Sequence, residues 1–242
     1  MAFFNTSGRS ETPVTTNLII INCIFLAATF VLGRIGVNLE NYLALHYYDS
    51  HLFNPMQMFT YMFMHADISH LFFNMFSLYF IGRGIEYFWG PGRYLIYYLV
   101  CGVGAAIVQQ IAWRWGMHDA MAQALASINP TASFETINAM SYNELLAYCE
   151  NYVDFYRTVG ASGCVFGILL AFGMMFPEQP VYLYFIMPIK AKYFVWGYGL
   201  IELFAGVRNS AGDNVAHFAH LGGMLFGLLL ILYWRKAHRH EL

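Results

Sequence analysis

Six apolar segments constrain the fold of this chain more than any other feature of its sequence. They fall at about 17–36, 66–88, 94–113, 161–176, 191–207 and 214–234. A helix of about 20 apolar residues is long enough to cross the hydrocarbon core of a bilayer. Because lipid offers no hydrogen bonds to the backbone, such a segment must satisfy its own N–H and C=O groups as a helix. The sequence therefore predicts an all-α, polytopic membrane protein with six transmembrane helices.

The composition excludes a soluble domain and a nucleic-acid partner. Hydrophobic residues make up 59% of the 242 positions and charged residues 11%, whereas soluble domains carry about 25% charged residues. The formal net charge of -2 gives no basic surface of the kind that nucleic-acid binding requires. The four cysteines show no paired spacing typical of a disulfide framework or a zinc site. We expect the lipid bilayer as the environment of this chain.

The distribution of Lys and Arg predicts the orientation. With the N-terminus inside, the inner segments hold Arg9, Arg83, Arg93, Lys190, Lys192, Arg235, Lys236 and Arg239, and the outer ones hold Arg34, Arg114, Arg157 and Arg208. The positive-inside rule then places both termini in the cytoplasm, and we expect a bacterial inner membrane. The whole chain, 1–242, is predicted to be one membrane domain. A polar outer insert at 114–159 interrupts it and contains a capping box, Ser141 to Glu144, that predicts a short helix.

Two polar residues inside the apolar segments, Ser162 and His220, are predicted to lie at the same depth. The fourth segment has only fifteen residues from Ser162 to Phe176, about 22 Å of helix at about 1.5 Å per residue, against a hydrocarbon core of about 30 Å. It therefore begins below the outer surface. On the sixth segment, His220 lies fifteen positions before Arg235, the first inner charge. A serine nucleophile and a histidine base at one height suit acyl transfer.

For Ser162 and His220 to meet, the fourth and sixth helices must approach each other closely. Each helix carries two glycines at the Gly-x-x-x-Gly spacing that allows close packing of membrane helices. These are Gly163 and Gly167 on the fourth helix and Gly223 and Gly227 on the sixth. The spacing predicts a contact between the two helices; ordinary close packing without chemistry is the alternative, which Ser162 and His220 beside the glycines make the less favoured one.

Further polar and aromatic residues are predicted near the same depth. His70 and Asn74 lie four apart on the second helix, so they share a face, and with the Ser162 N–H they can form an oxyanion hole; a helix–helix hydrogen bond is the alternative for either residue alone. Phe166, one turn below Ser162, is expected under the His220 ring. No carboxylate lies close to His220 in the sequence. Glu202 on the fifth helix can make a structural hydrogen bond, which the sequence favours, or orient a catalytic group.

Three ordered motifs resemble the rhomboid family of intramembrane serine proteases. They are His70-Leu71-Phe72-Phe73-Asn74, Gly160-Ala161-Ser162-Gly163 and Ala219-His220-Leu221-Gly222-Gly223, on the second, fourth and sixth helices. The resemblance implies a compact six-helix bundle with Ser162 as nucleophile, His220 as general base and acid, and no cofactor or metal. It also implies transmembrane protein segments as substrates. The outer loop 37–64 lacks the Trp-Arg pair of many relatives, which leaves its anchoring open.

Two other functions remain as alternatives to a protease. A membrane metalloenzyme could use four histidines on the outer side, namely His65, His70, His217 and His220, although the chain has no His-Glu-x-x-His motif. A non-proteolytic rhomboid-like protein could bind client helices without any reaction. Neither alternative gives Ser162 a role.

Overall fold

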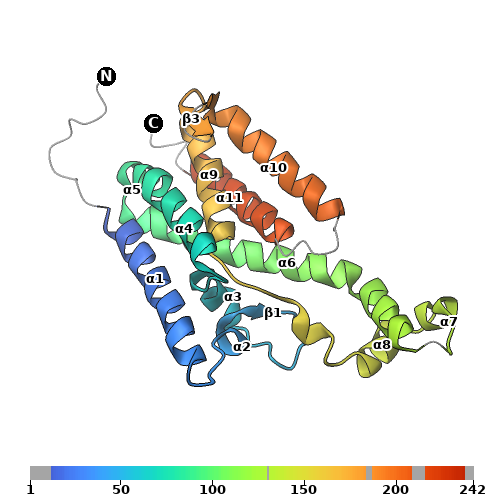
Figure 1. Cartoon of the computed structure of the whole chain (residues 1–242). Helices are drawn as coiled ribbons and strands as arrows, with labels where there is room; N and C mark the ends of the chain where they lie inside the picture. Colours follow the sequence, from blue (N-terminus) through green and yellow to red (C-terminus); the bar gives the residue numbers. More distant parts are fainter. Residues whose placement is uncertain (1–11, 130, 184–186, 209–215, 238–242) are drawn as a thin grey trace.

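Helices form most of the structure, as the apolar segments predict (Figure 1). The structure, a computed structural model, describes residues 12–129, 131–183, 187–208 and 216–237. Its long helices are α1 (Pro13–Gly33), α4 (Ile68–Ser77), α5 (Arg83–Trp89), α6 (Pro91–Ile128), α9 (Ser162–Met175), α10 (Ala191–Arg208) and α11 (His217–Ala237). The short helical elements are α2 (Glu40–Leu43), α3 (Gln57–Thr60), η1 (Tyr61–Phe63), η2 (Leu78–Gly82), α7 (Phe134–Asn138), α8 (Tyr142–Tyr148) and η3 (Val153–Phe155).

Each of the six predicted segments contains a helical stretch. The second is continuous from α4 through one π-helical stretch, η2, into α5. Positions 214 and 215 of the sixth segment lie outside the described residues. By length and composition, α1, α6 and α11 can cross a membrane, and α9 is a shorter apolar helix. Six crossings therefore remain a prediction, although the chain is clearly built for a membrane.

Glycines bring α9 and α11 into backbone contact, and α6 packs against both helices. A Cβ atom on Gly223 would overlap the carbonyl group of Gly163, and one on Gly167 would lie 3.1 Å from the Gly223 oxygen. Tyr97 of α6 donates a hydrogen bond of 2.8 Å to the Gly167 carbonyl. The Gly-x-x-x-Gly spacing thus marks the interface between α9 and α11 that the sequence predicts.

The predicted boundary of the polar insert requires a correction. The first fifteen residues of the segment 114–159 continue α6 without a break as far as Ile128. They do so because apolar side chains recur on one face of this extension and pack on the rest of the insert and on Tyr47. This second core consists of Tyr47, Met117, Met121, Ala122, Ile137, Leu145, Cys149 and Val153. The predicted capping box of Ser141 and Glu144 is confirmed at the start of α8.

The all-α expectation also needs a small correction, because two short antiparallel sheets occur among the described residues. The strands of the first are β1 (Leu45–His46) and β2 (Arg157–Thr158), and those of the second are β3 (Pro180–Leu183) and β4 (Met187–Lys190). The first sheet pairs the outer loop with the end of the insert, Leu45 opposite Thr158 and His46 opposite Arg157.

Polar contacts from the insert and α6 anchor the outer loop 37–64, which has no Trp or Arg of its own. The Gln110 amide of α6 donates a hydrogen bond of 2.6 Å to the His46 carbonyl and accepts one of 3.1 Å from the Tyr48 N–H. Arg157 forms an ion pair of 3.0 Å with Glu40. The insert and α6 therefore supply the anchoring of the outer loop that the sequence left open.

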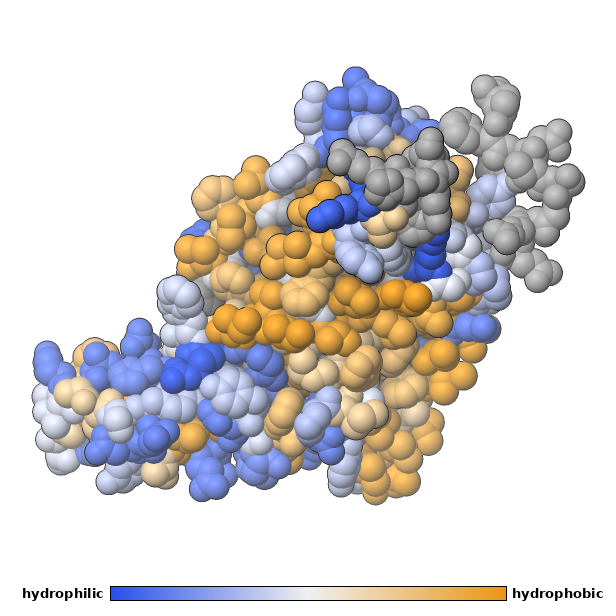
Figure 2. Space-filling model, turned by 180° about the vertical axis from the view of Figure 1, so that it is seen from behind, coloured by the Kyte–Doolittle hydropathy of each residue, from blue (hydrophilic) through white to orange (hydrophobic). Residues whose placement is uncertain are grey.

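The surface divides into an apolar body and a polar lobe. Figure 2 shows a broad hydrophobic band across the helices and a mostly hydrophilic lobe at one end, where α7 and α8 lie. Large apolar side chains are exposed along α1, α4 and α10, among them Ile24 at 58%, Phe73 at 66% and Trp196 at 74%. Exposure on this scale indicates contact with lipid.

A buried carboxylate, Glu86 of α5, caps the first turn of α1. It is 2% exposed and accepts hydrogen bonds from Val14 N at 2.9 Å and from Thr15 N and Oγ1 at 2.8 and 2.7 Å. A helix begins with N–H groups that lack intrahelical partners, and a carboxylate there also suits the helix dipole. Together with the hydrogen bond of 2.9 Å from Arg83 Nε to Thr12 Oγ1, this cap ties α5 to the start of α1.

We expect Glu86→Ala to lower the free energy of unfolding by about 3 kcal/mol, because it removes three charge-assisted hydrogen bonds and leaves buried donors unpaired. Thermal unfolding in detergent measures the effect. The matched control is Glu178→Ala, since Glu178 is an exposed carboxylate whose pKa is lowered to about 2 by hydrogen bonds from Lys190 and Lys192. Exposed ion pairs contribute little to stability. Equal unfolding temperatures for native protein and Glu86→Ala would contradict the capping role.

Candidate active site

Ser162 is the first residue of α9 and lies half-buried inside the bundle. The chain reaches it through Gly160, whose φ of 133° disfavours any residue with a side chain. A Cβ on Gly160 would lie 2.7 Å from His70 Cε1 and 3.6 Å from Ser162 Oγ. The bare glycine therefore leaves a small space that His70 and the Ser162 hydroxyl both border.

The His220 imidazole of α11 meets the Ser162 hydroxyl. His220 Nε2 lies 2.8 Å from Ser162 Oγ, and His220 is 8% exposed. Phe166 stacks on its ring, with centroids 4.2 Å apart and planes 7° from parallel. Gln109 Oε1 of α6 accepts a hydrogen bond of 3.1 Å from the Ala219 N–H in the first turn of α11. Packing and capping thus fix both the ring and the helix end that carries it.

Glu202 of α10 completes the hydrogen-bonded group. Its Oε2 atom accepts from His220 Nδ1 at 2.8 Å and from His217 Nδ1 at 2.7 Å. Glu202 is 4% exposed and shares the inward face of α10 with Ala191 and Val195. The sequence favoured a structural role for it, and the contact with His220 is the feature that this interpretation missed. Its one usable signal was a lone acid within an apolar segment.

His70 and Asn74 of α4 lie on one helix face, but the structure surrounds them differently. Asp67 caps the helix by accepting a hydrogen bond of 2.7 Å from the His70 N–H. The His65 ring lies edge-on to the His70 ring, with the ring centroids 5.0 Å apart. Asn74 is 5% exposed, and its Nδ2 donor has no protein partner. A buried donor without a partner costs free energy. A ligand oxygen that accepted a hydrogen bond from Asn74 Nδ2 would remove this cost.

The metalloenzyme alternative requires His65, His70, His217 and His220 at one point. Among the described residues, the one group of three or more potential ligands is Glu202, His217 and His220, whose ligating atoms lie within 4.8 Å of one another. His65 and His70 are not part of it. The structure therefore does not bring the four histidines together. The three residues that do lie together include His220, whose imidazole is hydrogen-bonded to Ser162.

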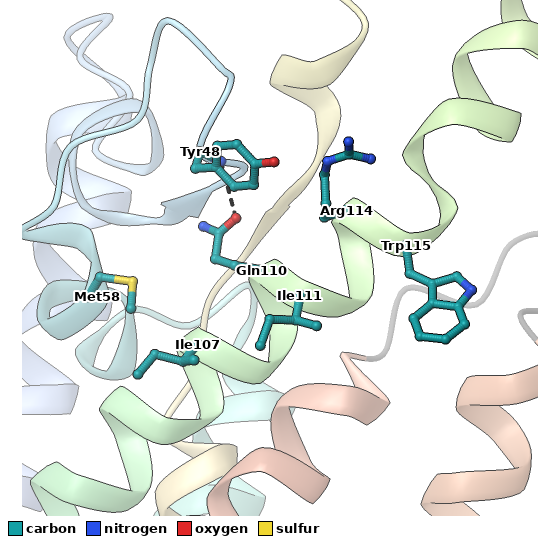
Figure 3. Close-up of a pocket in the computed structure, with 7 residues that line it drawn as sticks. All are labelled: Tyr48, Met58, Ile107, Gln110, Ile111, Arg114 and Trp115. Carbon is teal, nitrogen blue, oxygen red and sulfur yellow. Dashed lines mark hydrogen bonds between the residues drawn. The ribbon is translucent and has the colours of Figure 1, made fainter. Parts of the chain in front are cut away.

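One pocket among the described residues lies away from Ser162 (Figure 3). It is an open depression of about 660 Å³ along residues 107–115 of α6. Tyr48 and Met58 of the outer loop border it, and Arg114 and Trp115 close its far end. Ser162, His220 and Glu202 do not line this pocket, so it has no part in the candidate site.

Comparison with known proteins decides the family. The family model of the rhomboid domain matches residues 53–237, which is well over half of the chain and includes Ser162 and His220. The chain belongs to the rhomboid family. As the apolar helices and this family indicate, it is an integral membrane protein.

Three proteins similar to this rhomboid chain illustrate the range of the family. RHOMBOID-like protein 12, mitochondrial, of Arabidopsis thaliana is 28% identical over 227 residues, which is 89% of this chain and 56% of the relative. Rhomboid-like protease 3 of Toxoplasma gondii is 22% identical over 76% of this chain and 53% of its own length. Rhomboid protease AarA of Providencia stuartii is 26% identical over 74% of this chain and 56% of its own length. The chain thus spans little more than half the length of these relatives.

Proposed function

We propose that this rhomboid chain is an intramembrane serine endopeptidase that cleaves transmembrane segments of other proteins. The observation that carries the proposal is the hydrogen bond of 2.8 Å between Ser162 Oγ and His220 Nε2, within helices built for a membrane. Two relatives that are named as proteases support the same class of reaction. A polar pair inside apolar helices costs free energy and indicates function.

In the proposed reaction, His220 Nε2 takes the proton of Ser162 as the Oγ atom attacks the carbonyl carbon of the scissile peptide bond. The carbonyl oxygen becomes an oxyanion. When the intermediate collapses, His220 gives its proton to the leaving amide nitrogen, the C–N bond breaks, and the acyl group stays on Ser162. Water then releases the acyl group by the same steps, with His220 first as base and then as acid. No cofactor and no metal enter this sequence.

The oxyanion would form beside the N-terminus of α9. Unpaired N–H groups and the positive end of the helix dipole favour negative charge there. The His70 ring borders the same space above Gly160, and the Asn74 amide offers an unpaired donor. We propose that these two side chains, with the Ser162 N–H, form the oxyanion hole.

His70→Ala and Asn74→Ala are each expected to lower kcat on the order of 10²-fold, the usual effect of losing one oxyanion donor. KM should change little, since the donors act on charge that develops in the transition state. Cleavage of a model transmembrane substrate in detergent micelles measures both constants. Ser69→Ala, one residue from His70 on the exposed side of α4, is the control and should keep native kcat. Full activity in the double variant His70→Ala/Asn74→Ala would exclude both from the oxyanion hole.

The substrate class follows from the depth of the site. A regular transmembrane helix keeps its carbonyl groups in intrahelical hydrogen bonds, so a peptide bond must be exposed by local unwinding before Ser162 can attack it. Segments with small or helix-breaking residues near the outer surface meet this requirement at low cost. We propose such segments as substrates.

The orientation and compartment belong to the same proposal. We propose that the segments before α1 and after α11 lie in the cytoplasm of a bacterial cell, which the basic residues of the inner segments favour. Arg9 and Arg239, which that argument uses, lie outside the described residues. Reporter fusions in the insert and after α11 test the orientation; a cytoplasmic insert would reverse it. Localisation to mitochondria, as in the name of the Arabidopsis relative, would contradict the bacterial compartment.

The decisive experiment combines cleavage with labelling. Purified protein is incubated with a model transmembrane substrate, and a fluorophosphonate probe is used in parallel to label the active serine. We expect cleavage within the apolar segment and covalent labelling at Ser162, both insensitive to chelators. Intact substrate together with an unlabelled Ser162 would favour the non-proteolytic alternative that binds client helices.

A further inference from the structure

A carboxylate lies on the far side of the imidazole from Ser162. The chain of contacts runs from Ser162 Oγ to His220 Nε2 at 2.8 Å, and from His220 Nδ1 to Glu202 Oε2 at 2.8 Å. The side chains of His220 and Glu202 are only 10% and 6% exposed. Three residues from three helices, α9, α11 and α10, therefore form one continuous hydrogen-bonded line, in which His220 and Glu202 are nearly inaccessible to solvent.

We propose that Glu202 is a positioning residue for His220, so that the site works as a Ser162–His220–Glu202 triad rather than a dyad. This inference rests on the proposed protease function and adds to it. In soluble serine proteases, a carboxylate in this place holds the imidazole in its reactive tautomer and stabilises the imidazolium that forms. Such triads are recognised by geometry and not by sequence order.

The tautomer of His220 is set by its acceptor. An ionised carboxylate can only accept hydrogen bonds, so His220 Nδ1 must carry the proton that Glu202 receives. In the neutral ring, Nε2 then has its lone pair free and directed at the Ser162 hydroxyl. This is the tautomer that can remove the Ser162 proton. The stacked Phe166 ring fixes the plane of the imidazole but cannot choose between its two tautomers.

Charge is the second contribution. When His220 takes the Ser162 proton, it becomes a cation in a site that is shielded from water. A carboxylate hydrogen-bonded to that cation stabilises it more strongly than it would in water, because the local dielectric is low. Glu202 acquires this partner only as the transition state forms, so its effect is expected in kcat and not in binding.

The location of Glu202 argues against a purely structural contact between α10 and α11. Burying a carboxylate in a membrane helix is costly unless it is paired, and a neutral amide would join the two helices at lower cost. The carboxylate instead receives two imidazole donors on one oxygen, His217 and His220. Two donors on one acceptor hold it in place beside His220.

The test is the isosteric variant Glu202→Gln, which keeps the shape of the side chain and removes its charge. We expect kcat to fall on the order of 10²-fold, the lower range for a positioned acid–base group, with KM unchanged. The rate of fluorophosphonate labelling at Ser162 should fall by a similar factor, since it reports nucleophile activation without a peptide substrate. The His220 Nδ1 proton should resonate far downfield in the native protein and move upfield in the variant.

Tyr198→Phe is the matched control, one turn away on α10, and should keep native kcat and labelling. Thermal unfolding verifies that both variants are folded. A merely structural Glu202 would change the unfolding temperature and leave the labelling rate of the folded protein unchanged; that result overturns the triad. Loss of activity with a chelator, restored by Zn²⁺, would also overturn it, because Glu202, His217 and His220 would then be metal ligands.

The variants Glu202→Gln and Ser162→Ala test the triad and the protease function separately. If Glu202→Gln retains full kcat while Ser162→Ala is inactive, the protease proposal stands and the triad falls. If Ser162→Ala cleaves as fast as the native protein, the protease proposal falls and takes the triad with it.

Discussion

Replacing Ser162 with alanine is expected to lower kcat on the order of 10⁵-fold or more, to the background of the assay. The expected size is that of losing the nucleophile in a serine protease, where the remaining members of the site act only as a unit. Because Ser162 is half-buried at the start of α9 and the change removes one oxygen, the fold should be unaffected. Cleavage of a transmembrane substrate in micelles and thermal unfolding of the same sample measure both expectations.

The partner variant His220→Ala should lose as much activity, because the serine has no base without it. Combining the two changes should cost no more than either alone. Ser77→Ala is the control for the serine, since the Ser77 hydroxyl donates a hydrogen bond to the Phe73 carbonyl within α4 and does not touch the candidate site. For the histidine, the control is His51→Ala in the outer loop, where the ring pairs with Asp154. Cleavage by Ser162→Ala at more than a hundredth of the native rate would exclude Ser162 as nucleophile.

Gly223→Ala is the second change with a large expected effect, although it adds a single methyl group. That group would overlap the backbone carbonyl of Gly163, and backbone cannot move aside as a flexible side chain can. The two helices must separate, which we expect to lower the free energy of unfolding by about 3 kcal/mol. Gly163 adjoins Ser162, and Gly223 is one turn from His220. A displacement of about 1 Å in a reacting pair can cost on the order of 10²-fold in rate.

The control for the packing effect is Gly197→Ala on α10, where no described atom outside the adjacent backbone of that helix lies within 4 Å of the added methyl group. It should be neutral or slightly stabilising, because alanine is the better helix former. Thermal unfolding and kcat are compared for the two variants at equal detergent concentration. If Gly223→Ala melts with the native protein and keeps its kcat, the contact between α9 and α11 is not as tight as the structure has it.

The positions of the helices could be predicted from sequence because membrane helices have strong signals. Long apolar runs indicate each helix, and charges or prolines mark several ends, as Pro91 does at the start of α6 and Pro177 just beyond α9. The extension of α6 to Ile128 has no such signal. Residues 114–128 are mixed in polarity, and their helix is stabilised by packing on segments distant in sequence, including Tyr47. The apolar residues on one face of the extension allow such a helix, but the local sequence does not show which distant segments cover that face.

Much of the candidate site could also be inferred, because the depth of a residue in a bilayer follows from the number of helical residues between it and the membrane boundary. Ser162 and His220 were expected level with each other, and they lie in hydrogen-bonding contact. Phe166 was expected beneath the imidazole and stacks on it. Their catalytic roles, like those of His70 and Asn74, remain predictions for the variants above to test.

Glu202 shows where inference from sequence stopped. It lies eighteen positions before His220, on a different helix, and nothing local indicates which face of α10 turns inward. Ala191 and Val195 share its buried face, but α10 carries apolar residues all round, so no amphipathic stripe points to that face. The direction of the carboxylate depends on how α10 packs against α11.

By itself, the sequence determined that this chain is a helical membrane protein, and it placed a serine and a histidine at one depth with glycines beside each. Those features follow from hydropathy, helical rise and side-chain size, which are local properties. Only the tertiary structure decided which side chains meet across helices. Above all, it showed that Glu202 accepts a hydrogen bond from Nδ1 of His220, and that the insert pairs with the outer loop. Such contacts depend on the rotation of each helix about its axis, which is fixed by packing and not by any single segment.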